Sequence, residues 1–226
     1  LTPLRPSSMR WSKSPCMSSL SGCRVPKPVN KSGWVLTDSA INSLIDLRNG
    51  KLKRETCDKI ALVMHQLNIN VSDRKCLKAA LHKRDIANTV SMAIELTDGT
   101  IITSKTSDLL SAPAALILNA LKHLAGINDE LLLISPAIIE PLSEMKIKHL
   151  GNKNPRLHVD EVLIALTISA RTNPLAELAM KKLPMLKGCE AHSTAILAHV
   201  DCDVFKKLEI NLTSEPEVYA KKLYHN

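Results

Sequence analysis

Aromatic side chains are almost absent from this 226-residue chain, which has only one Phe, two Trp and two Tyr. Proteins that bind single-stranded nucleic acid stack bases on aromatic rings, so this scarcity argues against such a function. No apolar run reaches the roughly 18 residues that a membrane-spanning helix needs, so we expect no membrane partner. The hydrophobic fraction is 45%, which predicts a core made of aliphatic side chains.

Acidic residues are missing from residues 1–36, which hold six of the chain's 30 basic residues. The chain has 22 acidic residues, so the net charge falls from +8 for the whole chain to +2 for the rest. A nucleic-acid-binding domain concentrates its charge on a folded face, whereas this segment is rich in Ser and Pro and lacks hydrophobic periodicity. We therefore expect no nucleic-acid partner and a disordered or spurious basic tail over residues 1–36.

The six cysteines follow no regular spacing, and no secretory hydrophobic segment precedes them. We therefore expect a reduced, cytoplasmic protein without a disulfide framework. Cys189-x2-His192 and His199-x2-Cys202 offer four metal-ligating side chains, but only six residues separate the two pairs. Structural zinc sites usually have a longer spacer, so we predict no metal site. No motif identifies a cofactor, which stays unknown.

The hydrophobic pattern divides the rest of the chain into two parts. A small helical region covers residues 37–86, and an α/β domain covers 87–226 with a helical insertion at about 140–186. Within the α/β domain, two β-prone runs flank Asp98-Gly99, which predicts a hairpin over 91–103. The helices predicted in the small helical region cover 38–48, 52–67 and 72–82.

The elements after the hairpin follow from caps, from proline at helix starts and from apolar periodicity. Thr106, Ser107 or Asp108 caps a helix over 108–124, which ends at Gly126. The elements that follow are a strand over 131–135, a helix from Pro136, helices over 159–170 and 174–183, a strand over 189–198, a helix over 201–208 and a strand over 210–213. The helix over 159–170 is apolar on every side, which predicts that it is buried.

Strands that alternate with helices predict a layered α/β/α sandwich. The order of elements resembles the cytidine-deaminase-like topology, with the helical insertion and the small helical N-terminal region added to it. Zinc deaminases use the motifs H-x-E and P-C-x-x-C. Neither motif occurs in the chain, so the resemblance concerns topology alone.

The end of the hairpin offers a candidate anion site at Lys105, Thr106 and Ser107. Gly99-x4-Ser104-Lys105-Thr106 approximates a phosphate-loop motif, but its β-branched run from Thr100 to Thr103 favours an extended strand over a curled loop. A helix start after the strand would still present free N–H groups to a phosphate or carboxylate. The alternative is that Thr106 or Ser107 only caps the helix and that Lys105 is solvated.

The densest polar cluster is the segment NPRLHVDE at 154–161. Asn154 and Arg156 are candidate ligand-binding residues, because a guanidinium can hold an anion bidentately. His158 is a proton-transfer candidate, and Asp160 or Glu161 could orient it. The alternative is structural, since acids in a first helical turn stabilise the helix and Asn154-Pro155 is a common turn.

The predicted strand over 189–198 supplies further candidates. Period-two alternation places Glu190, His192 and Thr194 on one face and Cys189, Ala191 and Ser193 on the other. His192 and Ser193 could complete a polar pocket, with a buried, hydrogen-bonded histidine as the alternative. Cys189 is a candidate nucleophile only if its thiol is activated.

Most of the chain from about Val71 onward resembles an uncharacterised bacterial family, catalogued as domain of unknown function 1846. The likeness lies in IELTDGTIITSKTSDLLSA (94–112), LNALKHLAGI (118–127), LISPAIIEPL (133–142), LGNKNPRLHVDEVLIAL (150–166), LPMLKGCEAHST (183–194) and NLTSEP (211–216). Ser104, Pro113 and Glu209 depart from the family pattern of Gly, Ser and Gly. The resemblance implies that the chain corresponds to the C-terminal portion of a longer protein. Asn119 and Glu215, which lie in matched segments, complete the candidate ligand-binding residues.

Polar clusters at element boundaries of an aliphatic α/β body favour a cytoplasmic enzyme that acts on a small anionic, nucleotide-like metabolite. The alternative is a non-catalytic interaction or scaffold domain whose matched motifs are caps and turns. A homo-oligomer is compatible with either function. The enzyme hypothesis predicts that Lys105, Arg156 and His192 converge around one pocket, with side chains within about 10 Å of each other.

Overall fold

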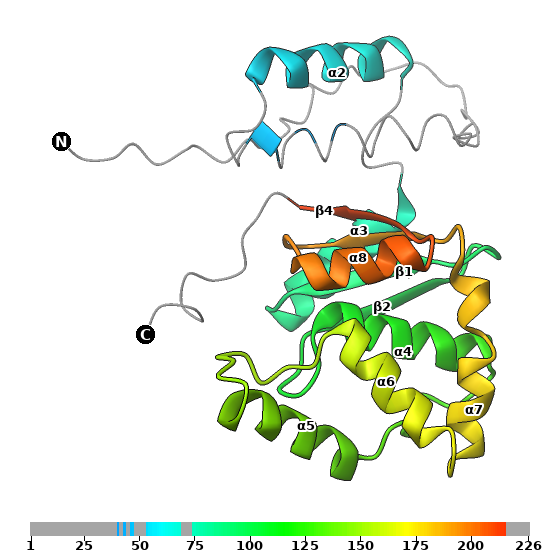
Figure 1. Ribbon diagram of the computed structural model, residues 1–226. Coiled ribbons are helices and arrows are strands. Elements are labelled where there is room, and N and C mark those ends of the chain that lie inside the picture. The colour runs from blue at the N-terminus through cyan, green and yellow to red at the C-terminus, as the bar shows by residue number, and fades with distance from the viewer. Residues whose placement is uncertain (1–39, 41–42, 44–45, 48–52, 69–73, 216–226) are drawn as a thin grey trace.

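The computed structural model describes residues 40, 43, 46–47, 53–68 and 74–215 (Figure 1). The predicted tail over residues 1–36 and most of the predicted helix over 38–48 lie outside these residues. The described part contains seven α-helices and one four-stranded sheet. None of its helices has the length and hydrophobicity that crossing a membrane requires.

The two N-terminal helices that are described match the predicted ones in position. Helix α2 covers Arg54–Gln66, as expected from the pattern over 52–67. Helix α3 covers Lys75–Ala87 and so runs past the predicted end at His82. It stops at Asn88, which adopts the left-handed conformation (φ 48°) that ends many helices.

The predicted hairpin is confirmed. Strands β1 (Ser91–Glu95) and β2 (Ile101–Lys105) pair antiparallel, with Ser91 opposite Lys105. Gly99 has φ 84°, a value that glycine adopts readily in a tight turn. The Asp98 carboxylate accepts a hydrogen bond from the Thr100 N–H at 2.8 Å. Because Ile101 to Lys105 is extended, the sequence after Gly99 does not form a phosphate loop.

The helix after the hairpin starts later than the predicted cap at 106–108. Helix α4 covers Ala112–Leu124, and its cap is Ser111, whose hydroxyl accepts from the Ala114 N–H at 3.4 Å. Ser107 instead closes a turn, because its side chain accepts from the Leu110 N–H at 3.1 Å. The predicted helix start was therefore wrong, and the free N–H groups of a helix end do not lie at Lys105 to Ser107.

The predicted strand over 131–135 is also wrong, because this segment is a loop before α5 (Pro136–Lys148). Leu133 and Ile134 are buried, whereas Leu131 and Leu132 are 46% and 61% exposed. A short apolar run has no periodicity that separates a buried strand from a loop that places two residues in the core. The helix start at Pro136 is confirmed, with Ser135 as its cap.

The sheet has the strand order β2-β1-β3-β4, with β3 at Glu190–Ser193 and β4 at Asn211–Ser214. Strand β3 pairs antiparallel with β1 and parallel with β4. Helix α8 (His199–Lys207) connects β3 to β4 and packs against β4 (Figure 1). The fold is mixed α/β as predicted, but this four-stranded sheet does not confirm the cytidine-deaminase-like topology.

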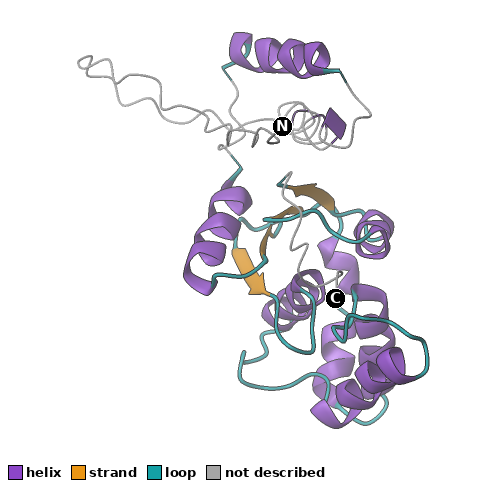
Figure 2. Cartoon of the chain, turned by 90° about the vertical axis from the view of Figure 1, so that its left-hand side faces the viewer, coloured by secondary structure: helices purple, strands orange, loops and turns teal. Residues whose placement is uncertain are grey.

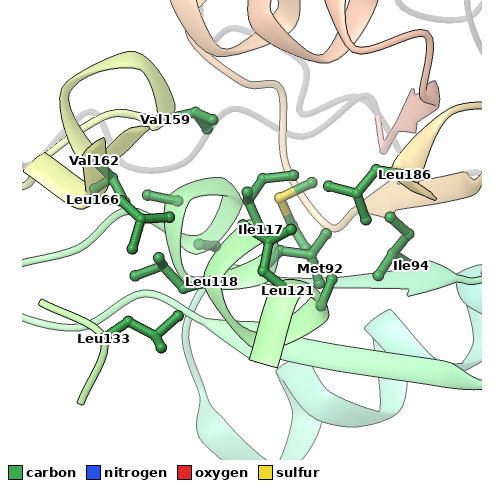
Figure 3. Close-up of a cluster of buried hydrophobic side chains, with 14 of the residues drawn as sticks. Met92, Ile94, Ile117, Leu118, Leu121, Leu133, Val159, Val162, Leu166 and Leu186 are labelled. Carbon is green, nitrogen blue, oxygen red and sulfur yellow. The ribbon is translucent and has the colours of Figure 1, made fainter. Parts of the chain in front are cut away.

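Helices cover both faces of the sheet (Figure 2). Ala93 packs with Cys76 and Ala80 of α3 on one face. Met92 and Ile94 point to the other face and join the main core with residues of α4 (Figure 3). Residues directly opposite each other in paired strands share a face, so the register assigns each β3 side chain to α3 or to the main core.

Three further helical segments precede β3, namely α6 (Val159–Ser169), α7 (Pro174–Met180) and the 3-10 turn η2 (Leu183–Leu186). Helix α6 packs against α4, α7 and α8. The predicted helix over 159–170 is therefore confirmed, but its burial on every side is not. Ile164 and Ile168 are 62% and 57% exposed, because the described part of the chain covers only one side of the helix.

Candidate functional site

The structure brings together two predicted clusters that lie far apart in the sequence. The loop after β2 runs beside the segment before α6, since the Leu157 N–H donates to the Leu109 carbonyl at 2.9 Å. The Ser111 N–H in turn donates to the Leu157 carbonyl at 3.1 Å. These backbone bonds place Ser107 and Arg156 next to each other.

Arg156 is held in this corner by two contacts. Its Nε donates to the Ser107 carbonyl at 2.7 Å, and its backbone N–H donates to the Asn154 side chain at 3.1 Å. In the described part of the chain, neither terminal nitrogen of the guanidinium takes part in a hydrogen bond shorter than 3.5 Å. Arg156 therefore keeps the two-pronged end that binds carboxylates and phosphates.

His158 forms the N-cap of α6 and pairs with Asp201 of α8. The His158 Nδ1 lies 2.9 Å from the Asp201 Oδ2, and the Val159 N–H donates to Oδ1 at 3.0 Å. Asp201 is only 2% exposed, whereas the His158 side chain keeps 25% of its surface accessible. Two contacts fix the carboxylate, which orients the imidazole and leaves Nε2 as the nitrogen for an outside group.

The environment of His158 favours the protonated ring. The hydrogen bond that His158 donates to the Asp201 carboxylate raises the pKa of His158 above its ordinary value of 6.5, against the opposing effect of burial. The Asp201 and Glu161 charges also raise this pKa, while Lys146 lowers it. A histidine with this balance is charged over more of the neutral range than a solvated one.

This raised pKa makes a testable prediction about stability. The folded protein binds the His158 proton more tightly than the unfolded chain, so the free energy of unfolding should fall as the pH rises through the folded pKa. The stabilisation is complete below about 6.5 and is lost above the folded value. Asp201→Asn should lower the His158 pKa, as measured by NMR titration from about pH 5 to about pH 9. His149→Gln, an exposed change, serves as the control, and an unchanged His158 titration in Asp201→Asn would contradict the assignment.

Glu161 has a structural role beside this pair. Its Oε2 accepts from the His158 backbone N–H and from the Lys146 ammonium of α5, both at 2.7 Å. Lys146 is 3% exposed and also donates to the Arg156 carbonyl at 2.7 Å. The side chain that orients His158 is Asp201, so the prediction that Asp160 or Glu161 has this role is wrong. The Asp160 Oδ1 is buried without a hydrogen bond among the described residues.

His192 lies on the face of the sheet that α3 covers, because it is opposite Ala93, and Ala93 packs against α3. Helices α6 and α8, which carry His158 and Asp201, lie on the side of the main core. Its Nδ1 is 2.8 Å from the Thr213 hydroxyl, and its Nε2 is 3.3 Å from Glu215 Oε1 without hydrogen-bond alignment. The buried imidazole is thus separate from His158, and the convergence of Lys105, Arg156 and His192 stays a prediction.

Three other predicted residues make contacts that hold the fold together, and a fourth, Cys189, is buried. The Ser193 hydroxyl donates to the Ala195 carbonyl at 2.7 Å, and the Asn119 amide donates to the Thr103 carbonyl at 3.1 Å. The Thr106 N–H continues the hairpin by donating to the Val90 carbonyl at 2.9 Å. Cys189 is 1% exposed, and burial raises the pKa of its thiol, which disfavours the thiolate that a nucleophile needs.

A cleft of about 690 Å³ lies elsewhere, between α8 and β4. None of the predicted site residues lines it. Cys202 and Lys206 of α8 and the apolar Ile196, Leu197 and Leu212 form much of its wall. Among the described residues, no three His, Cys, Asp or Glu side chains gather closely enough to hold a metal ion.

Sequence reasoning missed the two residues that organise the site, Lys146 and Asp201. Lys146 lies on α5 near the exposed Lys148, and no pattern distinguishes the two lysines. Asp201 resembles an ordinary acid in the first turn of α8. It is 43 residues from His158, so only the packing of α8 on α6 shows the pair.

Comparisons with known proteins identify the family of the chain and relatives that are similar to it. A family model described as "Domain of unknown function DUF1846, C-terminal" matches residues 72–224. The chain is 45% identical over 182 residues to the UPF0371 protein cu0538 of Corynebacterium urealyticum, covering 80% of this chain and 37% of the relative. It is also 45% identical over 195 residues to a UPF0371 protein of Clostridium botulinum type A, covering 83% and 39%. The chain therefore spans less than two fifths of the length of these curated relatives.

Proposed function

The chain belongs to the DUF1846 family, and we propose that this C-terminal domain contributes a proton-transfer site to an enzyme that acts on a small anionic metabolite. The observation that carries the proposal is the contact between His158 and the buried Asp201. A carboxylate that orients an imidazole through Nδ1 and favours its charged form is a recurring arrangement in general acid–base catalysis. The exposed part of the ring is where a substrate would meet Nε2.

Arg156 supplies the anion-binding part of the proposal. Two residues separate it in sequence from the start of α6, and its Nε bond to Ser107 fixes the direction of the guanidinium. Lys146 offsets the nearby Glu161 charge through their direct ion pair, which lowers the repulsion that an anion would meet. We propose that Arg156 holds a phosphate or carboxylate of a nucleotide-like metabolite while His158 gives or takes a proton.

We propose that Lys105 supplies a second positive group to the anion site. It is the last residue of β2 and is exposed, and one residue separates it from Ser107. Long lysine side chains contribute to phosphate binding as mobile point charges. We propose that Lys105 has a supporting role in anion binding. We also propose that the protein is cytoplasmic, because its irregular cysteine spacing is typical of a reduced protein.

Arg156→Ala tests the anion site. We expect its affinity for pyrophosphate or ATP to fall by about ten-fold or more, because a charge-assisted contact is lost. The change should leave the free energy of unfolding within about 1 kcal/mol, since the side chain is not buried. Isothermal titration calorimetry with both ligands gives the readout. Arg171→Ala removes an equal charge from the exposed turn that follows α6 and should leave binding unchanged.

The competing function is a non-catalytic interaction or scaffold domain. It is favoured by the contacts of Asn154, Ser107 and Glu161, all of which brace turns or caps. A thermal-shift screen of phosphate-bearing metabolites on the complete Corynebacterium urealyticum relative separates the two functions. No shift with any compound would contradict the enzyme proposal and support the scaffold.

A further inference from the structure

The outward side of α6 has the composition of a buried surface. We call Ile164, Thr167 and Ile168 the outer face of α6. The two isoleucines are 62% and 57% exposed and lie one helical turn apart. Apolar residues on both sides of a helix are typical of helices that are covered on both sides. In the described part of the chain, only the inward side is covered.

The polar atoms of α6 strengthen this argument. No charged residue occurs between Val162 and Ala170. The Thr167 hydroxyl donates to the Leu163 carbonyl at 2.7 Å, and the Ser169 hydroxyl donates to the Ala165 carbonyl at 2.8 Å. Thr167 is the one polar side chain of the outer face, and its proton is used within the helix, so that face offers water only the Thr167 hydroxyl oxygen.

Exposed apolar side chains are also frequent in this part of the sequence. Nine of the fourteen large hydrophobic residues that are exposed in the described part lie between Leu131 and Met185. The region holds α5, α6 and α7, at the side of the main core away from α3 (Figure 1). Scattered exposed leucines are ordinary, so the inference below depends on Ile164 and Ile168, which lie one turn apart on α6.

We infer that the outer face of α6 packs against the N-terminal portion of the complete family protein. The family model that matches this chain describes the C-terminal domain of the family proteins. The alignments cover only 37–39% of the length of the two relatives named above. More than half of each relative therefore lies outside the aligned part. In each relative, this portion belongs to the same chain as the helix that aligns with α6. Linkage in one chain gives that portion a high effective concentration at this face, which a second copy lacks.

Matched aspartate substitutions test this inference. Ile164→Asp with Ile168→Asp in the 226-residue chain should change Tm by less than about 2 °C, because both side chains are exposed. The same pair at the aligned positions of the complete Corynebacterium urealyticum protein should lower Tm by more than about 5 °C, because burying an unpaired charge is costly. Ile86→Asp is the control. It changes an isoleucine of α3 that is 70% exposed, and neither protein should respond to it.

Covalent surface labelling of the two unmodified proteins gives an independent readout. The helix aligned with Val159–Ser169 should be labelled in the 226-residue chain and protected in the complete relative. Equal labelling, equal Tm shifts or polar residues at the two aligned positions would overturn the inference. A dimer of the 226-residue chain that the double substitution converts to a monomer would also overturn it, because a second copy would then be the occupant.

Discussion

Replacing Phe205 with alanine is expected to lower the free energy of unfolding by about 3–5 kcal/mol. Phe205 is the only phenylalanine of the chain, and α8 buries its side chain completely in the main core. Among the described residues, no other member of the main core carries an aromatic ring, and a close-packed interior relaxes only partly around the space that a missing ring leaves. Urea unfolding of the 226-residue chain measures the effect.

Val200→Ala gives the matched control for Phe205. It changes the same helix at a side chain that is 45% exposed, so the expected loss is below about 1 kcal/mol. A similarly small loss for Phe205→Ala would mean that α8 is not firmly packed on the sheet. The positions of Asp201 and of the His158 pair would then be in question as well.

Lys146→Ala is expected to lower the free energy of unfolding by about 2–3 kcal/mol. The substitution removes a buried ammonium that bonds both Glu161 and the Arg156 carbonyl. The full cost of breaking a buried pair does not apply, because the Glu161 side chain is 31% exposed and stays partly solvated. NMR should also show a changed environment for His158, since its N–H shares the Glu161 oxygen with Lys146.

Lys148→Ala is the control for Lys146, because it lies on the same helix and pairs with Glu144 at the surface. Its side chain is 63% exposed, so a loss below about 0.5 kcal/mol is expected. Lys146→Met keeps the aliphatic volume and separates packing from charge. If Lys146→Met retained full stability and an unchanged His158 spectrum, the bracing role of the Lys146 ammonium would be wrong.

Local sequence signals predicted the elements whose structure depends on near neighbours. Asp98-Gly99 identified the hairpin, and Pro136 and Pro174 identified two helix starts. The same reasoning failed where one short segment could form more than one local structure. Ser107 closes a turn although it could have capped a helix, and Leu133 enters the core from a loop that had been predicted as a strand.

The sequence by itself determined the mixed α/β class, the aliphatic core and the family, because these depend on composition, periodicity and motifs along the chain. Only the tertiary structure decided which polar residues meet. The side chains of His158 and Asp201 are 43 residues apart in sequence and 2.9 Å apart in space. His192, which had been grouped with His158, faces α3. The register of β3 and the packing of α8 on α6 determine both results, and neither arises from interactions between neighbours in the sequence.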